Sequence, residues 1–154
     1  MGALFLALKV LLNPGDEVIV NEPCWTNYIQ QIRMCGGVPV SVKTDAQRGF
    51  DLDVSAVAET ITSKTKAIIL NSPCNPTGAV ASAETLSQLA KLAQERDLVV
   101  LADEVYKHIL FDGRTYTGFA TLPGMKERTL VIDSLSKTYA MTGWRIATPL
   151  DRRN

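Results

Sequence analysis

The sequence predicts an α/β protein with a doubly wound, mostly parallel sheet, and two observations support this fold class. Apolar strand-like runs alternate along the chain with segments whose apolar residues recur at helical spacing. The last three runs, at residues 67–70, 98–102 and 129–132, are continuously apolar apart from Thr129, instead of apolar at every second position. This continuous pattern is typical of parallel strands that helices cover on both faces.

The first predicted element is a helix over residues 3–12, the most apolar stretch of the chain, which Asn13-Pro14-Gly15-Asp16 ends. A helix that is apolar on nearly every face is expected to be buried on every side. Few residues precede this one to bury it, which indicates that the chain is a piece of something larger. The stretch is too short to span a bilayer, and it lacks the basic leader and cleavage pattern of a signal peptide.

Strands and helices then alternate. Strands are predicted over residues 17–20 and 38–42, separated by a helix over residues 26–34 that Cys35-Gly36-Gly37 ends. Two further helices begin at expected N-caps, Asp53 and Ser82. The helix after Asp53 repeats apolar residues at Val54, Val57, Ala58 and Ile61, and the helix after Ser82 does so at Leu86, Leu89, Ala90 and Ala93.

Composition and charge exclude several classes of function. The 154 residues are enough for one domain with its own core, and a formal net charge of zero argues against a nucleic-acid partner. The three cysteines form no Cys-x-x-Cys pair, so we expect reduced thiols in a cytoplasmic protein. His108 is the only histidine and no ligand cluster surrounds it, so no metal site is expected.

Polar residues follow three of the predicted strands where each strand ends. The first group is Asn75-Pro76-Thr77-Gly78, the second is Asp103-Glu104-Val105-Tyr106, and the third is Asp133-Ser134-Leu135-Ser136-Lys137. Open parallel sheets bind ligands at the carboxyl ends of their strands, and neighbouring strands lie about 5 Å apart. Three such ends can therefore surround one small ligand.

The chemistry of these groups matches pyridoxal 5′-phosphate (PLP). Lys137 is expected to be poorly hydrated just past a buried strand, and its amine is a candidate nucleophile for the cofactor aldehyde. Asp103 is the candidate carboxylate that keeps the pyridine nitrogen protonated. Arg145 and the hydroxyl of Ser134 are the candidate phosphate ligands.

Three more side chains complete the predicted cofactor site. Asn75 and Tyr106 can donate hydrogen bonds to the phenolate oxygen of the ring, and Trp25 can stack on its face. Each feature also has a plain structural explanation. Asn75-Pro76-Thr77-Gly78 alone is a plausible turn, Asp103 a plausible N-cap, and Trp25 a plausible core aromatic. Lys137 alone is a plausible surface lysine, and it is the combination that favours a site.

These motifs give the chain a resemblance to the class I/II aminotransferases, which are PLP-dependent enzymes of fold type I. The resemblance covers residues 2–146 and rests on the segments at 75–78, 103–106 and 134–145, which occur in the family's order and approximate spacing. It implies that Lys137 forms the Schiff base with PLP and moves the proton of the substrate α-carbon. It further implies amino acid and 2-oxo acid substrates and a homodimer with sites at the subunit interface.

The departures from the family divide the chain into an incomplete PLP-binding large domain, residues 1–146, and a divergent tail, residues 147–154. The family implies a phosphate-cradling loop before Met1 and, after Ile146, a smaller domain with an arginine that grips the substrate carboxylate. The expected function is an aminotransferase, present as a fragment that is not competent alone. Alternatives are a PLP-dependent C–S lyase or related synthase, a non-catalytic remnant, and an effector-binding module of a transcription regulator.

Overall fold

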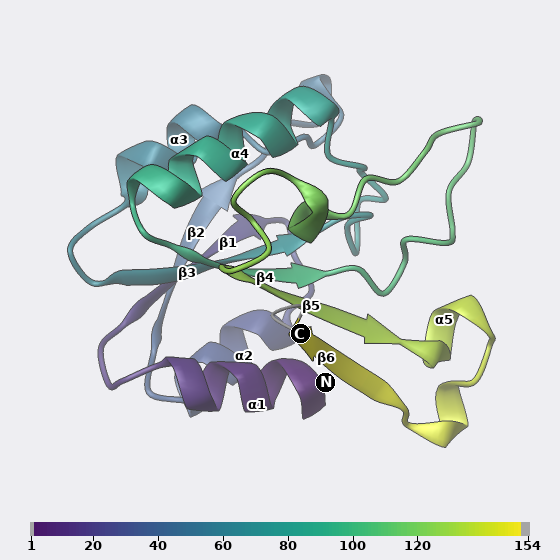
Figure 1. The fold of residues 1–154 in the computed structure, drawn as a ribbon, viewed down its shortest axis with the longest axis horizontal. Helices are drawn as coiled ribbons and strands as arrows, with labels where there is room; N and C mark the ends of the chain where they lie inside the picture. The colour runs from purple at the N-terminus through teal and green to yellow at the C-terminus, as the bar shows by residue number, and fades with distance from the viewer. Residues whose placement is uncertain (1, 152–154) are drawn as a thin grey trace.

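Six strands form a single sheet in the order β2-β1-β3-β4-β5-β6, of which the first five are parallel and β6 is antiparallel (Figure 1). The computed structural model describes the backbone of residues 2–151 and the side chains through residue 147. The strands are β1 Glu17–Glu22, β2 Val38–Lys43, β3 Thr65–Asn71, β4 Val99–Asp103, β5 Thr129–Ser134 and β6 Ala147–Asp151. The predicted α/β class and mostly parallel sheet are confirmed.

Helices cover both faces of this sheet (Figure 1). Helices α1 (Gly2–Leu11) and α2 (Asn27–Met34) lie on one face, and α3 (Val54–Thr60) and α4 (Ala83–Glu95) lie on the other. Alternate residues of the central strands feed two separate cores. Ile68 of β3 packs with α3 and α4, whereas Ile69 packs with α1 and α2. The continuously apolar strands of the sequence are therefore explained by burial on both faces.

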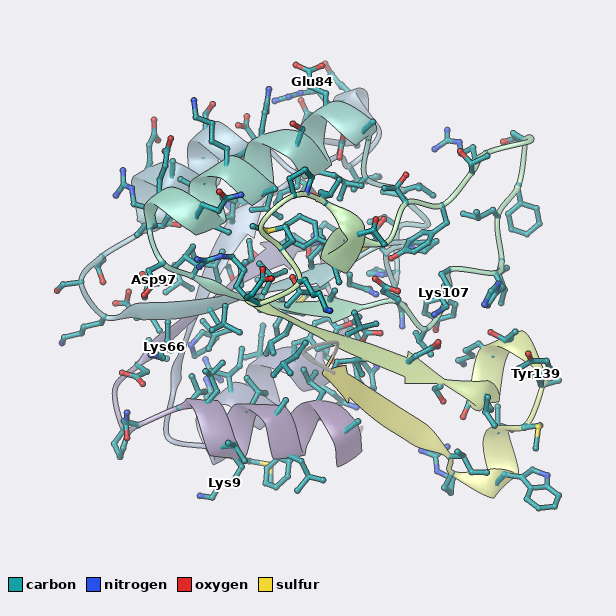
Figure 2. All side chains as sticks on the ribbon, in the orientation of Figure 1. Lys9, Lys66, Glu84, Asp97, Lys107 and Tyr139 are labelled. Carbon is teal, nitrogen blue, oxygen red and sulfur yellow. The ribbon has the colours of Figure 1, made fainter. Side chains whose placement is uncertain are left out.

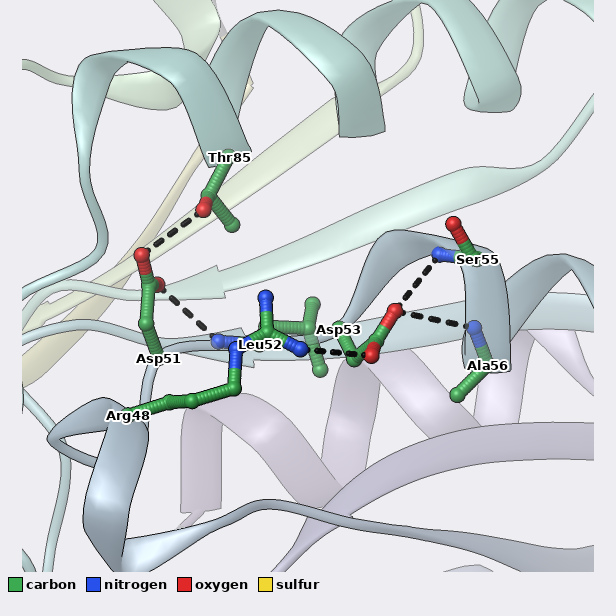
Figure 3. A network of polar contacts seen from close by, with 7 residues as sticks. All are labelled: Arg48, Asp51, Leu52, Asp53, Ser55, Ala56 and Thr85. Carbon is green, nitrogen blue, oxygen red and sulfur yellow. Dashed lines mark hydrogen bonds and ion pairs between the residues drawn. The ribbon is translucent and has the colours of Figure 1, made fainter.

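The predicted N-caps start their helices. The Asp53 carboxylate accepts hydrogen bonds from the N–H groups of Ser55 and Ala56 at 3.0 and 3.2 Å, and it pairs with Arg48 at 2.7 Å (Figure 3). The Ser82 hydroxyl accepts from Thr85 N at 3.1 Å. Each cap satisfies N–H groups that have no partner within the first turn of a helix.

Two short elements extend beyond the sheet at its carboxyl end. Helix α5 (Leu135–Thr138) and the 3₁₀ turn η3 (Thr142–Trp144) connect β5 to β6, and η1 (Ala46–Arg48) and η2 (Phe119–Thr121) lie in earlier loops. In Figure 1 the loop between β4 and η2 also reaches out at this end of the molecule. The carboxyl ends of β3, β4 and β5 therefore open toward irregular segments that carry the predicted site residues.

Two expectations differ from the structure. Helix α1 is buried on one face only, through Ala3, Leu4, Ala7 and Leu8, while Leu6 and Val10 are exposed. The expected burial on every side is therefore not met by the described residues, because only one sheet face and α2 pack against this helix. The polar tail after Ile146, where no strand was predicted, begins as strand β6, which pairs with β5 from Ala147↔Ser134 to Asp151↔Leu130.

Among residues 2–151, no helix is long and apolar enough to cross a membrane. The described part of the chain also contains no group of three or more His, Cys, Asp or Glu side chains placed to hold a metal ion. Cys24, Cys35 and Cys74 are free thiols.

Candidate active site

A cavity of about 640 Å³ lies where β3, β4 and β5 end. Its walls come from the segments after these strands, the first turns of α1, and the start of α2. All of the side chains predicted to bind the cofactor line this one cavity. They are Trp25, Asn75, Asp103, Tyr106, Ser134, Lys137 and Arg145. The parallel topology brings together residues that are more than 100 positions apart in the sequence.

Asp103 is a buried carboxyl group in the wall of this cavity. It is the last residue of β4, and both of its carboxylate oxygens accept hydrogen bonds. Tyr28 donates its hydroxyl to Oδ2 at 2.7 Å, and Val105 donates its N–H to Oδ1 at 3.3 Å. Burial raises the pKa of Asp103 above its usual range, while these two hydrogen bonds act in the opposite direction. A cation placed against Asp103 would stabilise its ionised form.

The backbone of Asn75 is held by the side chain of Asn71, a buried residue that ends β3. The Asn75 N–H donates to Asn71 Oδ1 at 2.8 Å, and Asn71 Nδ2 donates to the carbonyl of Asp103 at 3.1 Å. One side chain therefore fixes the backbone of Asn75 relative to that of Asp103. Gly78 has a φ of +72° and closes the following turn onto Cys74 O at 2.8 Å, as expected for a glycine at that place.

Lys137 lies on α5, with its amine 5.7 Å from the centre of the Tyr106 ring. This distance permits a cation–π contact between the amine and the ring. It also places the amine beside Tyr106, which is predicted to donate a hydrogen bond to the phenolate oxygen of PLP. The lysine is exposed, so the expected poor hydration is not found in the structure. The reason is that α5 extends past the sheet instead of folding back over it (Figure 1).

Ser134 and Arg145 lie on the two sides of the α5–η3 segment. The Ser134 hydroxyl accepts from Ser136 N at 3.1 Å as the N-cap of α5, and it donates to Ile146 O at 2.9 Å. The Arg145 guanidinium donates to Thr142 O at 2.9 Å. Both groups therefore make local bonds here, and a phosphate would take over some of these contacts.

The aromatic wall consists of Trp25 and Tyr28. Their rings meet edge to face, with centroids 5.4 Å apart and planes at 88°. Trp25 is partly buried, whereas Tyr28 is fully buried and bonded to Asp103. Burial, and next the charge of Asp103, raise the pKa of the Tyr28 hydroxyl well above its usual range, so Tyr28 acts as a neutral donor.

Two further residues of the cavity region, Tyr28 and Asn71, were not predicted from the sequence. A signal for Tyr28 was available, because it lies three residues after Trp25 at the start of a predicted helix and so shares its face. Asn71 was visible as a polar residue ending an apolar strand. Their hydrogen-bond partners cannot be predicted without knowing which strands are neighbours in the sheet.

The comparisons with known proteins agree with this fold. The profile of the family Aminotransferase class I and II matches residues 1–149. The putative aminotransferase YugH of Bacillus subtilis is 47% identical over 144 residues, which are 94% of this chain and 37% of that protein. The aspartate/prephenate aminotransferase of Thermus thermophilus is 45% identical, with the same shares covered.

Solved structures give the same result. The aromatic aminotransferase of Pyrococcus horikoshii superposes with a TM-score of 0.92 at 41% identity, covering 95% of this chain and 39% of that one. The aspartate aminotransferase of Thermus thermophilus with maleate superposes with a TM-score of 0.89 at 44% identity, covering 94% and 37%.

The fold and the family match place this α/β protein in the aminotransferase class. The chain belongs to the class I and II aminotransferase family. It spans a little over a third of the length of the relatives that it matches, about 37% for the two named above.

Proposed function

We propose that this chain carries the cofactor-binding part of a PLP-dependent aminotransferase that acts on amino acids and 2-oxo acids. The observation that supports this most directly is the convergence of an amine, a buried carboxylate and an arginine around one cavity, from Lys137, Asp103 and Arg145. We further propose a cytoplasmic protein that is a homodimer in its full-length form.

The donor set fits PLP group by group. Asp103 is buried and bonded on both oxygens, yet no cationic side chain is paired with it among the described ion pairs, and its raised pKa reflects that burial. A protonated pyridine nitrogen would supply the cation. Arg145 lines the same cavity, and its guanidinium offers the bidentate geometry that a phosphate accepts.

Each residue would then have a defined role. Lys137 Nζ would hold the cofactor aldehyde and would be placed to move the proton of the substrate α-carbon. Asp103 would keep the pyridine nitrogen protonated, and Tyr28, which donates a hydrogen bond to Asp103, orients that carboxylate. When bound, PLP supplies an electron sink that stabilises negative charge at the substrate α-carbon.

The remaining residues position the ring. Asn75 and Tyr106 would donate to its phenolate oxygen, and Trp25 would cover one face. Ser134 and Arg145 would bind the phosphate. Preorganised donors of this kind are the usual source of charge stabilisation in enzyme sites.

The test is to identify the lysine that reacts with PLP. The 154-residue chain is incubated with PLP, reduced with borohydride, and digested for peptide mapping. We expect the label to concentrate on Lys137 and to disappear from this peptide in Lys137→Met, with Lys91→Met as the control that keeps it. Labelling spread evenly over the lysines would contradict the proposal.

A further inference from the structure

Lys107 joins two of the strand ends that form the cavity. Its Nζ atom lies 2.6 Å from Asp133 Oδ2 and 3.8 Å from Glu104 Oε2. Lys107 directly follows Tyr106 after β4, and Asp133 directly precedes Ser134 at the end of β5. The ion pair therefore crosses from the segment that carries Tyr106 to the segment that carries Ser134 and Lys137, and Figure 2 shows Lys107 at this end of the sheet.

The pair is sheltered enough to have an energetic effect. The Lys107 and Asp133 side chains are 18% and 23% exposed, and the Glu104 side chain is 4% exposed. Ion pairs on the open surface contribute little, because water and salt screen them, whereas breaking a sheltered pair leaves a poorly solvated charge. By comparison, the Lys91–Glu95 pair on α4 is 3.8 Å long, with side chains 79% and 55% exposed.

The two oxygens of the Asp133 carboxylate contact two different segments of the chain. Oδ2 receives Lys107, and Oδ1 accepts the N–H of Ser134 at 2.7 Å. Because the N–H belongs to the residue proposed to bind phosphate, the orientation of Asp133 sets the orientation of that residue. Lys107 holds Asp133 in place from the other side.

Charge adds a second effect. Asp133 lines the cavity beside Ser134, where the proposed function places a phosphate. An uncompensated carboxylate there would repel a phosphate dianion. Asp133 also contributes, after the larger effect of burial, to the raised pKa of Asp103, which indicates that its charge is felt within the cavity.

Resting on the proposed function, we infer that Lys107 is a positioning residue of the cofactor site. It neutralises Asp133 next to the phosphate end of the cavity and ties the Tyr106 segment to the Ser134–Lys137 segment. The Glu104 carboxylate, 3.8 Å from Lys107 Nζ, gives Lys107 its second anionic neighbour. Lys107 itself touches neither cofactor nor substrate in this scheme.

The decisive experiment compares PLP with pyridoxal, which has the same ring and aldehyde and no phosphate. Affinities are measured by absorbance titration for the parent chain, Lys107→Met, Asp133→Asn, the double variant, and the control Lys91→Met. We expect Lys107→Met to weaken PLP binding about tenfold and pyridoxal binding less than about threefold, since only the phosphate meets the unpaired charge. The double variant is expected to recover PLP affinity to within about threefold of the parent. Equal losses for both ligands, or no loss, would overturn the inference.

Hydrogen exchange of the cofactor-free chain separates this inference from the proposed function. Lys107→Met is expected to speed exchange in peptides covering residues 104–110 and 130–138, and Lys91→Met is expected to leave both unchanged. If the parent chain binds no PLP, the proposed function fails while this exchange result still tests the link between the two segments. Unchanged exchange in Lys107→Met would refute that link.

Discussion

Asp103 is a buried carboxyl group whose ionisation is made unfavourable by the fold. It is buried and ionisable, and its hydrogen bonds from Tyr28 and Val105 do not fully offset burial, because its pKa is still raised. A residue selected for folding alone would seldom be a carboxylate in that position. The arrangement is explained if a cationic ligand completes it.

Asp103→Asn is therefore expected to separate stability from binding. A raised pKa means that the folded state holds the proton of Asp103 more tightly than the unfolded chain does. The stability contributed by Asp103 is full below the ordinary aspartate pKa of about 4 and is lost as pH rises through the raised pKa. Asparagine cannot ionise, so the cofactor-free variant is expected to be as stable as the parent at pH 7, or more stable, with the difference shrinking toward pH 4.

The measurement is urea unfolding of both proteins at several pH values, together with PLP titration. PLP is expected to bind the variant about tenfold more weakly, because a charge-assisted bond to the pyridine nitrogen is lost. In a full-length homologue, the same change should cut turnover by orders of magnitude. A variant that is clearly less stable at pH 7 and binds PLP normally would assign Asp103 a structural role instead.

At the scale of elements, the start of α3 shows how local sequence determines a helix end. Asp53 caps the helix and pairs with Arg48, while neighbouring Asp51 accepts a hydrogen bond from Thr85 of α4 at 2.8 Å (Figure 3). The hydrogen bond from Ala56 N–H, followed by that from Arg48, lowers the pKa of Asp53. This cap lies away from the cavity residues and offers a test of stability alone.

Asp53→Ala is expected to reduce the free energy of unfolding by about 1 kcal/mol at pH 7, the usual effect of losing an N-cap. Because the folded state lowers the pKa of Asp53, its ionic contribution is present above pH 4 or so and is lost as pH falls through the lowered pKa. Asp53→Asn keeps the cap and loses the charge, so it should retain most of the stability. Urea unfolding measures both variants, and a change in PLP affinity would show that α3 communicates with the site.

Strand β6 could not be predicted from the pattern of apolar and polar residues. Its sequence, Ala147-Thr148-Pro149-Leu150-Asp151, is short and polar and contains a proline, which argues against a central strand. In the order of the described sheet β6 pairs with β5 alone, and a proline is tolerated in a strand with one free side. The strands β3, β4 and β5 were predictable because burial on both faces leaves a continuous apolar run.

Across the whole molecule, topology explains why the convergence of the candidate site residues on one cavity was predictable from sequence while their supporting contacts were not. Parallel strands bring their carboxyl ends to one edge, so polar residues after apolar runs had to meet there. The supporting contacts depend on tertiary geometry. Tyr28 reaches Asp103 across 75 positions, and Lys107 in the turn after β4 reaches Asp133 near the end of β5. No spacing rule in a single sequence encodes those pairs.

Exposed apolar side chains cluster on the elements that surround the cavity and on α1. Leu135, Tyr139, Trp144 and Ile146 are exposed around α5 and η3, and Figure 2 shows Tyr139 pointing away from the body of the molecule. Leu6 and Val10 are exposed on α1. Apolar surfaces of this kind favour association, so the chain is expected to self-associate as its concentration rises.

We expect the 154-residue chain to bind PLP and not to transfer amino groups at an appreciable rate. Lys137 and Arg145 are both exposed, so water reaches the groups that must hold the cofactor. Arg145 is the only arginine among the described residues that line the cavity. If it binds the phosphate, no second guanidinium is available there to orient a substrate carboxylate, and loss of that orientation costs orders of magnitude in rate.

The assay uses the purified chain, shown by circular dichroism to be folded, with PLP and a panel of amino acid and 2-oxo acid pairs. A full-length aminotransferase from the same family serves as the matched control under identical conditions. We expect PLP labelling at Lys137 with turnover at least about a thousandfold below the control, since both orientation and exclusion of water are reduced. Turnover near that of the full-length enzyme would show that these residues alone position the substrate, and the assignment of Arg145 to the phosphate would then have to be abandoned.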